Sequence, residues 1–163
     1  MELEILSTAA QIAVALAGFA GVVVVFRRES VHKWSPIDKF RLRSLLSNSV
    51  LPLGLSMIAL LLLGIKPEPS GIWRWCSGIE FVVFVAFGIT TMTSFRRLDL
   101  QHLQGASANF IFNLFTTVGW GATLLQLYNV ALLGAFWPFF TGIVVQLVAA
   151  MIQFARMILL PPE

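Results

Sequence analysis

The side chain with the clearest capacity for chemistry in this 163-residue sequence is the carboxyl group of Glu80. It is the only charged group well inside a long apolar stretch, and ionisable groups at such positions in membrane proteins are costly and usually functional. Counted from Trp73, it lies roughly 10 Å along a helix. It either serves the function of the protein or, as a protonated carboxyl, forms a structural hydrogen bond with a neighbouring helix. The sequence leaves both interpretations open.

Amide and hydroxyl side chains recur at helical spacing in two further apolar stretches. In the stretch after Gly105, polar positions at spacings of four and three residues fall on one helical face. They are Asn109, Asn113, Thr116, Trp120 and Thr123. The last stretch carries a comparable small and polar line: Gly142, Gln146, Ala149, Gln153 and Arg156. Such faces either close against each other or line a water-filled path. Closure is the expectation for most positions, because amides buried against amides need no further partner.

The polar side chains also sort by depth once the apolar stretches are threaded through a bilayer. We expect an outer layer in which Gln11 lies at the depth of Glu80, together with Thr123 and Gln126. An inner layer holds more amides and Arg156. The candidates for a polar layer or pore are Glu80, Gln11, Asn48, Asn109, Asn113, Thr116, Thr123, Gln146 and Gln153. In membrane bundles such groups mainly hold helices together, typically with less than about 1–2 kcal/mol per contact.

The remaining residues do not form a catalytic or cofactor-binding set. His32 and His102 lie in charged segments, Cys76 is the single cysteine, and no lysine falls inside an apolar stretch. A haem, a Schiff base, a histidine- or cysteine-based metal centre and a Ser-His-Asp hydrolase are therefore not expected. We predict a protein that is not an enzyme and holds no cofactor or metal. Its basic residues lie between apolar stretches rather than on one face, so nucleic acid is not an expected partner.

The composition places the chain in a lipid bilayer. Hydrophobic residues make up 58% and charged residues 12%, with a mean hydropathy of +0.85, whereas about a quarter of residues are charged in soluble proteins. The apolar stretches are long enough to cross a hydrocarbon core of roughly 30 Å. The sequence predicts one all-α domain, an integral membrane bundle of five transmembrane helices, at about 4–26, 44–65, 72–95, 107–127 and 137–160. A short loop is expected at 128–136. Four spans are the alternative, which would leave long apolar segments unaccounted for.

The charged segment 27–43 orients the predicted bundle. Of the 11 Lys and Arg residues, only Lys66 and Arg74 fall on the opposite side, so the positive-inside rule places the N-terminus outside and the C-terminus inside. Ser35 as N-cap, Pro36 as the first helical residue and Asp38 near the positive end of the dipole predict a helix that continues into the second span. We expect contact with lipid headgroups or water for Trp34, Lys39, Arg41, Arg43, Arg96 and Arg97.

The first apolar stretch carries small residues at helical spacing, which predicts a face for close helix packing. They are Ala10, Ala13, Ala17 and Gly21. Three features resemble a family of small bacterial multi-span inner-membrane proteins without a known activity: the run 17–24 (AGFAGVVV), Trp34 followed by Asp38, Arg41 and Leu42, and the run 153–156 (QFAR). The resemblance implies a multi-pass protein of the bacterial inner membrane and carries no mechanism.

Two functions fit these features. A homo-oligomeric ion channel or pore can assemble from small subunits around a polar face, with Glu80 near its outer mouth. A non-catalytic accessory or scaffold subunit of a larger membrane complex needs no unseen chemistry, and it would bind another membrane protein or anionic lipid headgroups. The pore is the preferred hypothesis, because Glu80 and the polar line of the fourth stretch are costly in a subunit that faces only lipid.

Overall fold

The computed structural model describes residues 1–26, 31–65, 71–97 and 106–159, and it has no β-strand in these ranges. It contains five helices that are long and apolar enough to cross a bilayer, which confirms the predicted all-α membrane bundle. They are α1 (Glu2–Phe26), α2 (Pro36–Ile65), α3 (Ile72–Arg97), α5 (Ala106–Tyr128) and α6 (Phe136–Leu159). A 3₁₀ turn, η1 (Val31–Lys33), precedes α2, and a π-helical segment, η2 (Asn129–Leu133), continues α5.

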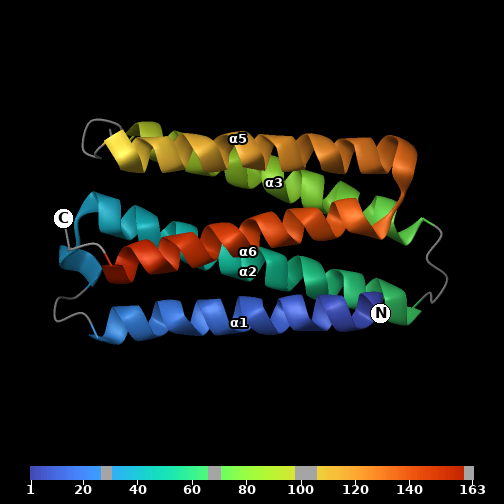
Figure 1. The fold of residues 1–163 in the computed structure, drawn as a ribbon, viewed down its shortest axis with the longest axis horizontal. Coiled ribbons are helices and arrows are strands. Elements are labelled where there is room, and N and C mark those ends of the chain that lie inside the picture. Colours follow the sequence, from blue (N-terminus) through green and yellow to red (C-terminus); the bar gives the residue numbers. More distant parts are fainter. Residues whose placement is uncertain (27–30, 66–70, 98–105, 160–163) are drawn as a thin grey trace.

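The helices run antiparallel, so that α1 begins at one end of the bundle and α6 finishes at the other (Figure 1). α1, α2 and α6 pack against one another, while α3 and α5 pair and close against α2 and α6. α1 and α5 therefore lie at opposite edges of the molecule (Figure 1). The bundle thus has one side built on three packed helices and another side in which four helices, α2, α3, α5 and α6, surround a common centre.

The main core lies between α1, α2 and α6. α1 contributes a stripe of buried small and leucine side chains: Leu6, Ala9, Ala13, Leu16 and Ala20. Larger side chains of the other two helices fill the space opposite, among them Leu45, Leu55, Phe139 and Ile143. Small residues let helix backbones approach closely, which explains the tight packing of α1. Of the face predicted on α1, Ala13 is fully buried, Ala10 and Ala17 are half-buried, and Gly21 is exposed.

α2 begins as the sequence predicts. The hydroxyl of Ser35 accepts a hydrogen bond from the backbone N–H of Asp38 at 3.1 Å, which is the N-cap interaction, and Pro36 is the first helical residue. The Nζ of Lys39 donates to the carbonyl of His32 at 2.9 Å and so ties the preceding turn to the helix.

Two residues expected at the headgroups lie inside the protein instead. Trp34 is 4% exposed and belongs to the main core, because the turn before α2 folds its ring inward. Arg41 is 3% exposed, and its Nη1 lies 3.5 Å from Oδ1 of the equally buried Asp38, one helical turn away. A buried guanidinium needs a nearby carboxylate, and Asp38 supplies it. The other basic candidates are exposed as expected: Lys39, Arg43, Arg96 and Arg97.

The connection between α5 and α6 is shorter than the loop expected at 128–136. The helix continues through η2, turns at Gly134, whose φ is +62°, and restarts at Phe136. The side chain of Asn129 holds this turn: its Oδ1 accepts from the N–H of Ala135 and its Nδ2 donates to the carbonyl of Ala135, both at 2.9 Å. The turn is thus built around a buried amide, which also reaches α3 by donating to the hydroxyl of Ser77 at 2.7 Å.

Candidate functional site

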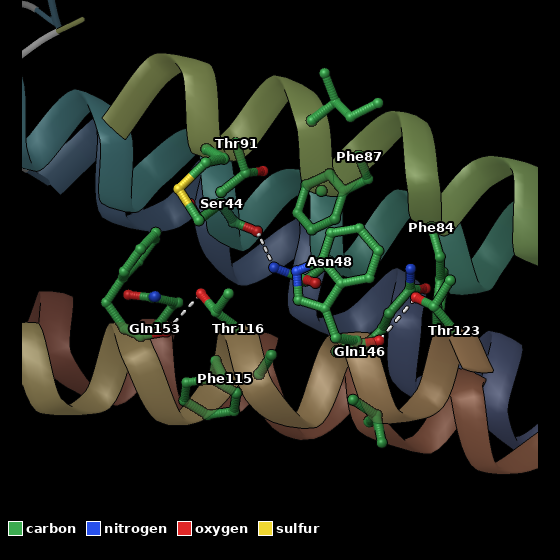
Figure 2. A pocket seen from close by; sticks show the side chains of 18 of the residues that line it. Ser44, Asn48, Phe84, Phe87, Thr91, Phe115, Thr116, Thr123, Gln146 and Gln153 are labelled. Atoms are coloured by element: carbon green, nitrogen blue, oxygen red, sulfur yellow. Dashed lines mark hydrogen bonds between the residues drawn. The ribbon is translucent and has the colours of Figure 1, made fainter. Parts of the chain in front are cut away.

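A cavity of about 320 Å³ lies at the centre of α2, α3, α5 and α6. Aromatic side chains form much of its wall: Phe40, Phe84, Phe87, Phe112, Phe115 and Trp120. Hydroxyl and amide groups form the rest, notably Ser44, Asn48, Thr91, Thr116, Thr123, Gln146 and Gln153. Figure 2 shows these polar side chains converging on the space from opposing helices. The volume falls at the lower end of the range of about 300–1,000 Å³ found for small-molecule sites.

Each of the four helices contributes wall residues that recur at helical spacing and so lie on one face of that helix. On α2 the line is Phe40, Ser44 and Asn48, and on α6 it is Gln146, Ala149 and Gln153. Glycines on the other two helices, Gly88 and Gly119, keep the centre open: a Cβ built at either position would have no neighbouring atom within 4 Å. The wall of the cavity therefore combines small residues with aromatic ones.

A cluster of three phenylalanine rings, one pair of them stacked, lies at the inner end of the cavity. The rings of Phe95 and Phe112 are nearly parallel, with centroids 3.8 Å apart and an interplanar angle of 7°. Phe40 completes the cluster, at 6.0 Å from Phe95 and 6.2 Å from Phe112. Phe40 and Phe112 are themselves wall residues, so the cluster is the floor of the cavity on the side of the basic segment.

The carboxyl group of Glu80 lies just beyond the outer end of the cavity. It is fully buried, and neither of its oxygens has a hydrogen-bond partner among the described residues. It packs against the backbone of Gly142: a Cβ at that glycine would overlap Oε1 of Glu80 and would lie 2.7 Å from its Cδ. The same Cβ position is 3.0 Å from Nε2 of Gln126, which donates to the carbonyl of Pro138 at 2.8 Å. Glu80, Gln126 and Gly142 thus form one polar layer across α3, α5 and α6.

One helical turn, about 5.4 Å, separates this layer from the wall of the cavity. Phe84 lies one turn inward from Glu80, Thr123 one turn inward from Gln126, and Gln146 one turn inward from Gly142. Gln146 is 4% exposed, and its amide nitrogen and oxygen both lack a partner within the described structure. The side-chain amide oxygens of Gln126 and Gln153 also lack a hydrogen-bond partner among the described residues. A chain of unpaired polar groups therefore leads from the cavity to the carboxyl of Glu80.

Polar atoms that are buried without a partner each cost about 1–3 kcal/mol. Water or a polar ligand removes this cost when it occupies the space beside them, and a polar cavity needs room for only one water to be filled. At about 30 Å³ per water, this cavity has room for roughly ten. Pro52 has no N–H, so the backbone carbonyl of Asn48, four residues earlier in α2, loses its usual helical donor.

The structure brings together most, though not all, of the residues that the sequence singles out for a polar path. The members that line the cavity are Asn48, Thr116, Thr123, Gln146 and Gln153, and Glu80 borders it. Gln11 is exposed on α1, away from the cavity wall, and Asn113 is exposed on α5. The side chain of Asn109 lies outside the described residues. The polar line of α5 is therefore divided between the cavity and the lipid-facing surface.

Sequence reasoning missed two parts of the site. One is the aromatic wall, for which Phe84, Phe87 and Gly88 on one stretch were the available signal. The other lies beside the cavity wall rather than in it: Asn129, which falls in the loop expected at 128–136, is fully buried and bonds Ser77 of α3, one turn from Glu80. Comparison of this chain with protein-family models, with curated proteins and with solved structures gave no match, so the site is defined by its geometry alone.

Proposed function

We propose that this protein is a small ion channel or pore of the cell membrane, in which the path for cations runs through the centre of α2, α3, α5 and α6. The observation that carries the proposal is the buried carboxyl of Glu80, which has no partner among the described residues and lies one turn from the cavity. An ionisable group inside a bundle is costly unless it serves a path or a ligand. Unpaired amides in the wall give a moving ion or proton successive oxygen and nitrogen contacts.

The path is lined by four helices of a single subunit, α2, α3, α5 and α6. Such an arrangement differs from a pore on the axis of a ring, because assembly is not needed to shield Glu80 from lipid. We propose homo-oligomerisation separately. Each subunit of the oligomer would contain its own path, so assembly would add paths without forming a new one on the axis. Under the positive-inside rule Glu80 lies in the outer half of the bilayer, and the expected location is the bacterial inner membrane.

The cluster of Phe40, Phe95 and Phe112 is the proposed constriction. Hydrophobic rings gate ion paths by excluding water, and these three rings close the cavity on the proposed cytoplasmic side. Conduction then requires that the stacked pair of Phe95 and Phe112 separate. The two rings belong to α3 and α5, so a shift of one helix relative to the other would separate them.

The test is cation and proton flux into liposomes that contain the purified protein. We expect flux through the wild type and at least a tenfold lower rate for Glu80→Gln, which keeps the shape of the side chain but replaces the carboxyl by an amide that cannot ionise. Glu4→Gln is the matched control, since Glu4 is 86% exposed at the start of α1 and should leave the rate unchanged. The proposal is abandoned if the wild type passes no cation under any gradient or voltage.

A second function, an accessory or scaffold subunit, is favoured by one observation. Gln11 presents an amide on the exposed side of the apolar helix α1, and such a group in lipid gains from a partner helix. Photo-crosslinking from position 11 in native membranes distinguishes the two arrangements. A single dominant different protein supports the accessory function, whereas contacts only with other copies of this chain support the homo-oligomer.

A further inference from the structure

We infer that the cavity is a binding site for a small organic ammonium ion, a quaternary or tertiary amine with an apolar substituent, whose positive charge lies between the aromatic wall and Glu80. The inference rests on the proposed function, in which Glu80 is the charge of the cation path. It adds the chemical class of the cation that the path admits.

The aromatic wall is the first observation. Six Phe and Trp rings line one cavity, and faces of aromatic rings attract ammonium groups, most strongly when the groups are shielded from water. None of the described wall residues is basic, so no fixed positive charge opposes a cation. An anion would meet the same rings and the carboxyl of Glu80 without a countercharge, and it is therefore excluded as the natural occupant.

The second observation is that the polar atoms are spread along the cavity rather than gathered at one point. Gln146 and Gln153 are two turns apart on α6, and Glu80 lies one turn further outward. A bare metal ion needs several oxygens converging at about 2.0–2.6 Å. The described residues contain no group of three or more His, Cys, Asp or Glu side chains that could hold one. A quaternary ammonium has no such need, because it binds through diffuse contacts with rings and a single carboxylate.

The third observation is access from the side of the molecule. Two residues of the wall are exposed on the outer surface, Ile89 of α3 at 54% and Trp120 of α5 at 49%. The cavity therefore reaches the lipid-facing surface of these two helices. A molecule with an apolar part can partition into the bilayer and enter there, whereas a strongly hydrated ion would have to cross hydrocarbon first.

The experiment measures equilibrium binding of benzyltrimethylammonium to the full-length protein in nanodiscs of phosphatidylglycerol. We expect saturable binding, at least tenfold weaker binding to Glu80→Gln, and no competition by neopentylbenzene, which has the same shape without the charge. Gly119→Leu fills the cavity and should abolish binding. Gly18→Leu is its matched control, because both glycines have open space at the Cβ position but Gly18 lies on the exposed side of α1.

The outcomes separate this inference from the proposed function. Binding that is absent in the wild type, or that survives both Glu80→Gln and Gly119→Leu in helical, monodisperse protein, overturns the inference. Flux without binding leaves the ion path standing and removes the ammonium site. Binding of the probe without cation flux supports the ammonium site and overturns the proposed ion path. Nanodiscs with added phosphatidylcholine, whose headgroup is a quaternary ammonium, distinguish the source of the ammonium: loss of probe binding there identifies a lipid headgroup as the occupant, and unchanged binding identifies a free amine.

Discussion

The position of the Glu80 carboxyl group depends on the glycine at position 142. The glycine has a helical backbone, so its role does not depend on a special φ value. It is needed because the carboxyl occupies the space where a Cβ would stand. The close approach of α3 to α6 at this level therefore depends on the absence of a single methyl group.

We predict that Gly142→Ala displaces the Glu80 side chain and lowers the free energy of unfolding by about 1–3 kcal/mol, the usual cost of overpacking. The thermal unfolding midpoint in detergent should fall, and flux should fall with it. Gly18→Ala is the matched control. A Cβ there meets no atom within 4 Å, so the substitution should raise stability slightly through helix propensity, by up to about 1 kcal/mol. Equal stability of the two variants would contradict this account of Gly142.

Asn129 is the second residue whose side chain determines local structure. It forms three hydrogen bonds, two with the backbone of Ala135 and one with Ser77 of α3. Because the amide is fully buried, its removal would leave partners unpaired on two elements at once.

We predict that Asn129→Ala lowers the free energy of unfolding by about 2–4 kcal/mol, since each buried group left without a partner costs about 1–3 kcal/mol. Asn113→Ala is the control on the same helical segment, because Asn113 is exposed and its loss should change stability by less than about 0.5 kcal/mol. Thermal unfolding of both variants in the same detergent checks the difference. A small effect of Asn129→Ala would mean that the turn does not depend on its amide.

At the scale of elements, the number and approximate bounds of the helices were predictable because each apolar stretch is long enough to cross a bilayer. The start of α2 was predictable too, since Ser35 and Pro36 act within one turn. Which face of each helix points into the bundle was not predictable from the sequence. A helix in lipid is apolar on all sides, so its pattern does not distinguish a buried face from one in contact with lipid. Gln11 and Asn113 are polar but exposed, while Asn129 belongs to the turn-like dipeptide Tyr128-Asn129 and is buried.

The predicted headgroup residues show the same limit. The sequence places Trp34 and Arg41 at the membrane surface because that is where such residues gather on average. In the structure Asp38 provides a buried partner for Arg41, and the turn of η1 carries Trp34 into the core. The burial of Arg41 and of Trp34 depends on their contacts in the folded protein, and these contacts cannot be predicted from the composition of the segment.

At the scale of the whole molecule, the orientation in the bilayer is the prediction with the widest consequence. The two ends of α3 each offer an exposed reporter, Trp75 and Arg97. In a Cys76→Ser background, we expect Trp75→Cys to react with a membrane-impermeant maleimide in intact cells. Arg97→Cys should react only after the membrane is permeabilised, because the positive-inside rule places that end in the cytoplasm. The reverse pattern would invert the bundle and put the Phe40, Phe95 and Phe112 cluster on the outer side.

The cavity also gives the molecule an uneven mechanical response. α1, α2 and α6 pack through small side chains in the main core, whereas α2, α3, α5 and α6 surround about 320 Å³. Unfolding under hydrostatic pressure is favoured in proportion to the empty volume that it eliminates. If the cavity is dry, pressure should separate α3 and α5 from the rest of the bundle well before α1 is released. If water fills it, that difference disappears, so compressibility reports directly on what occupies the centre of the four helices.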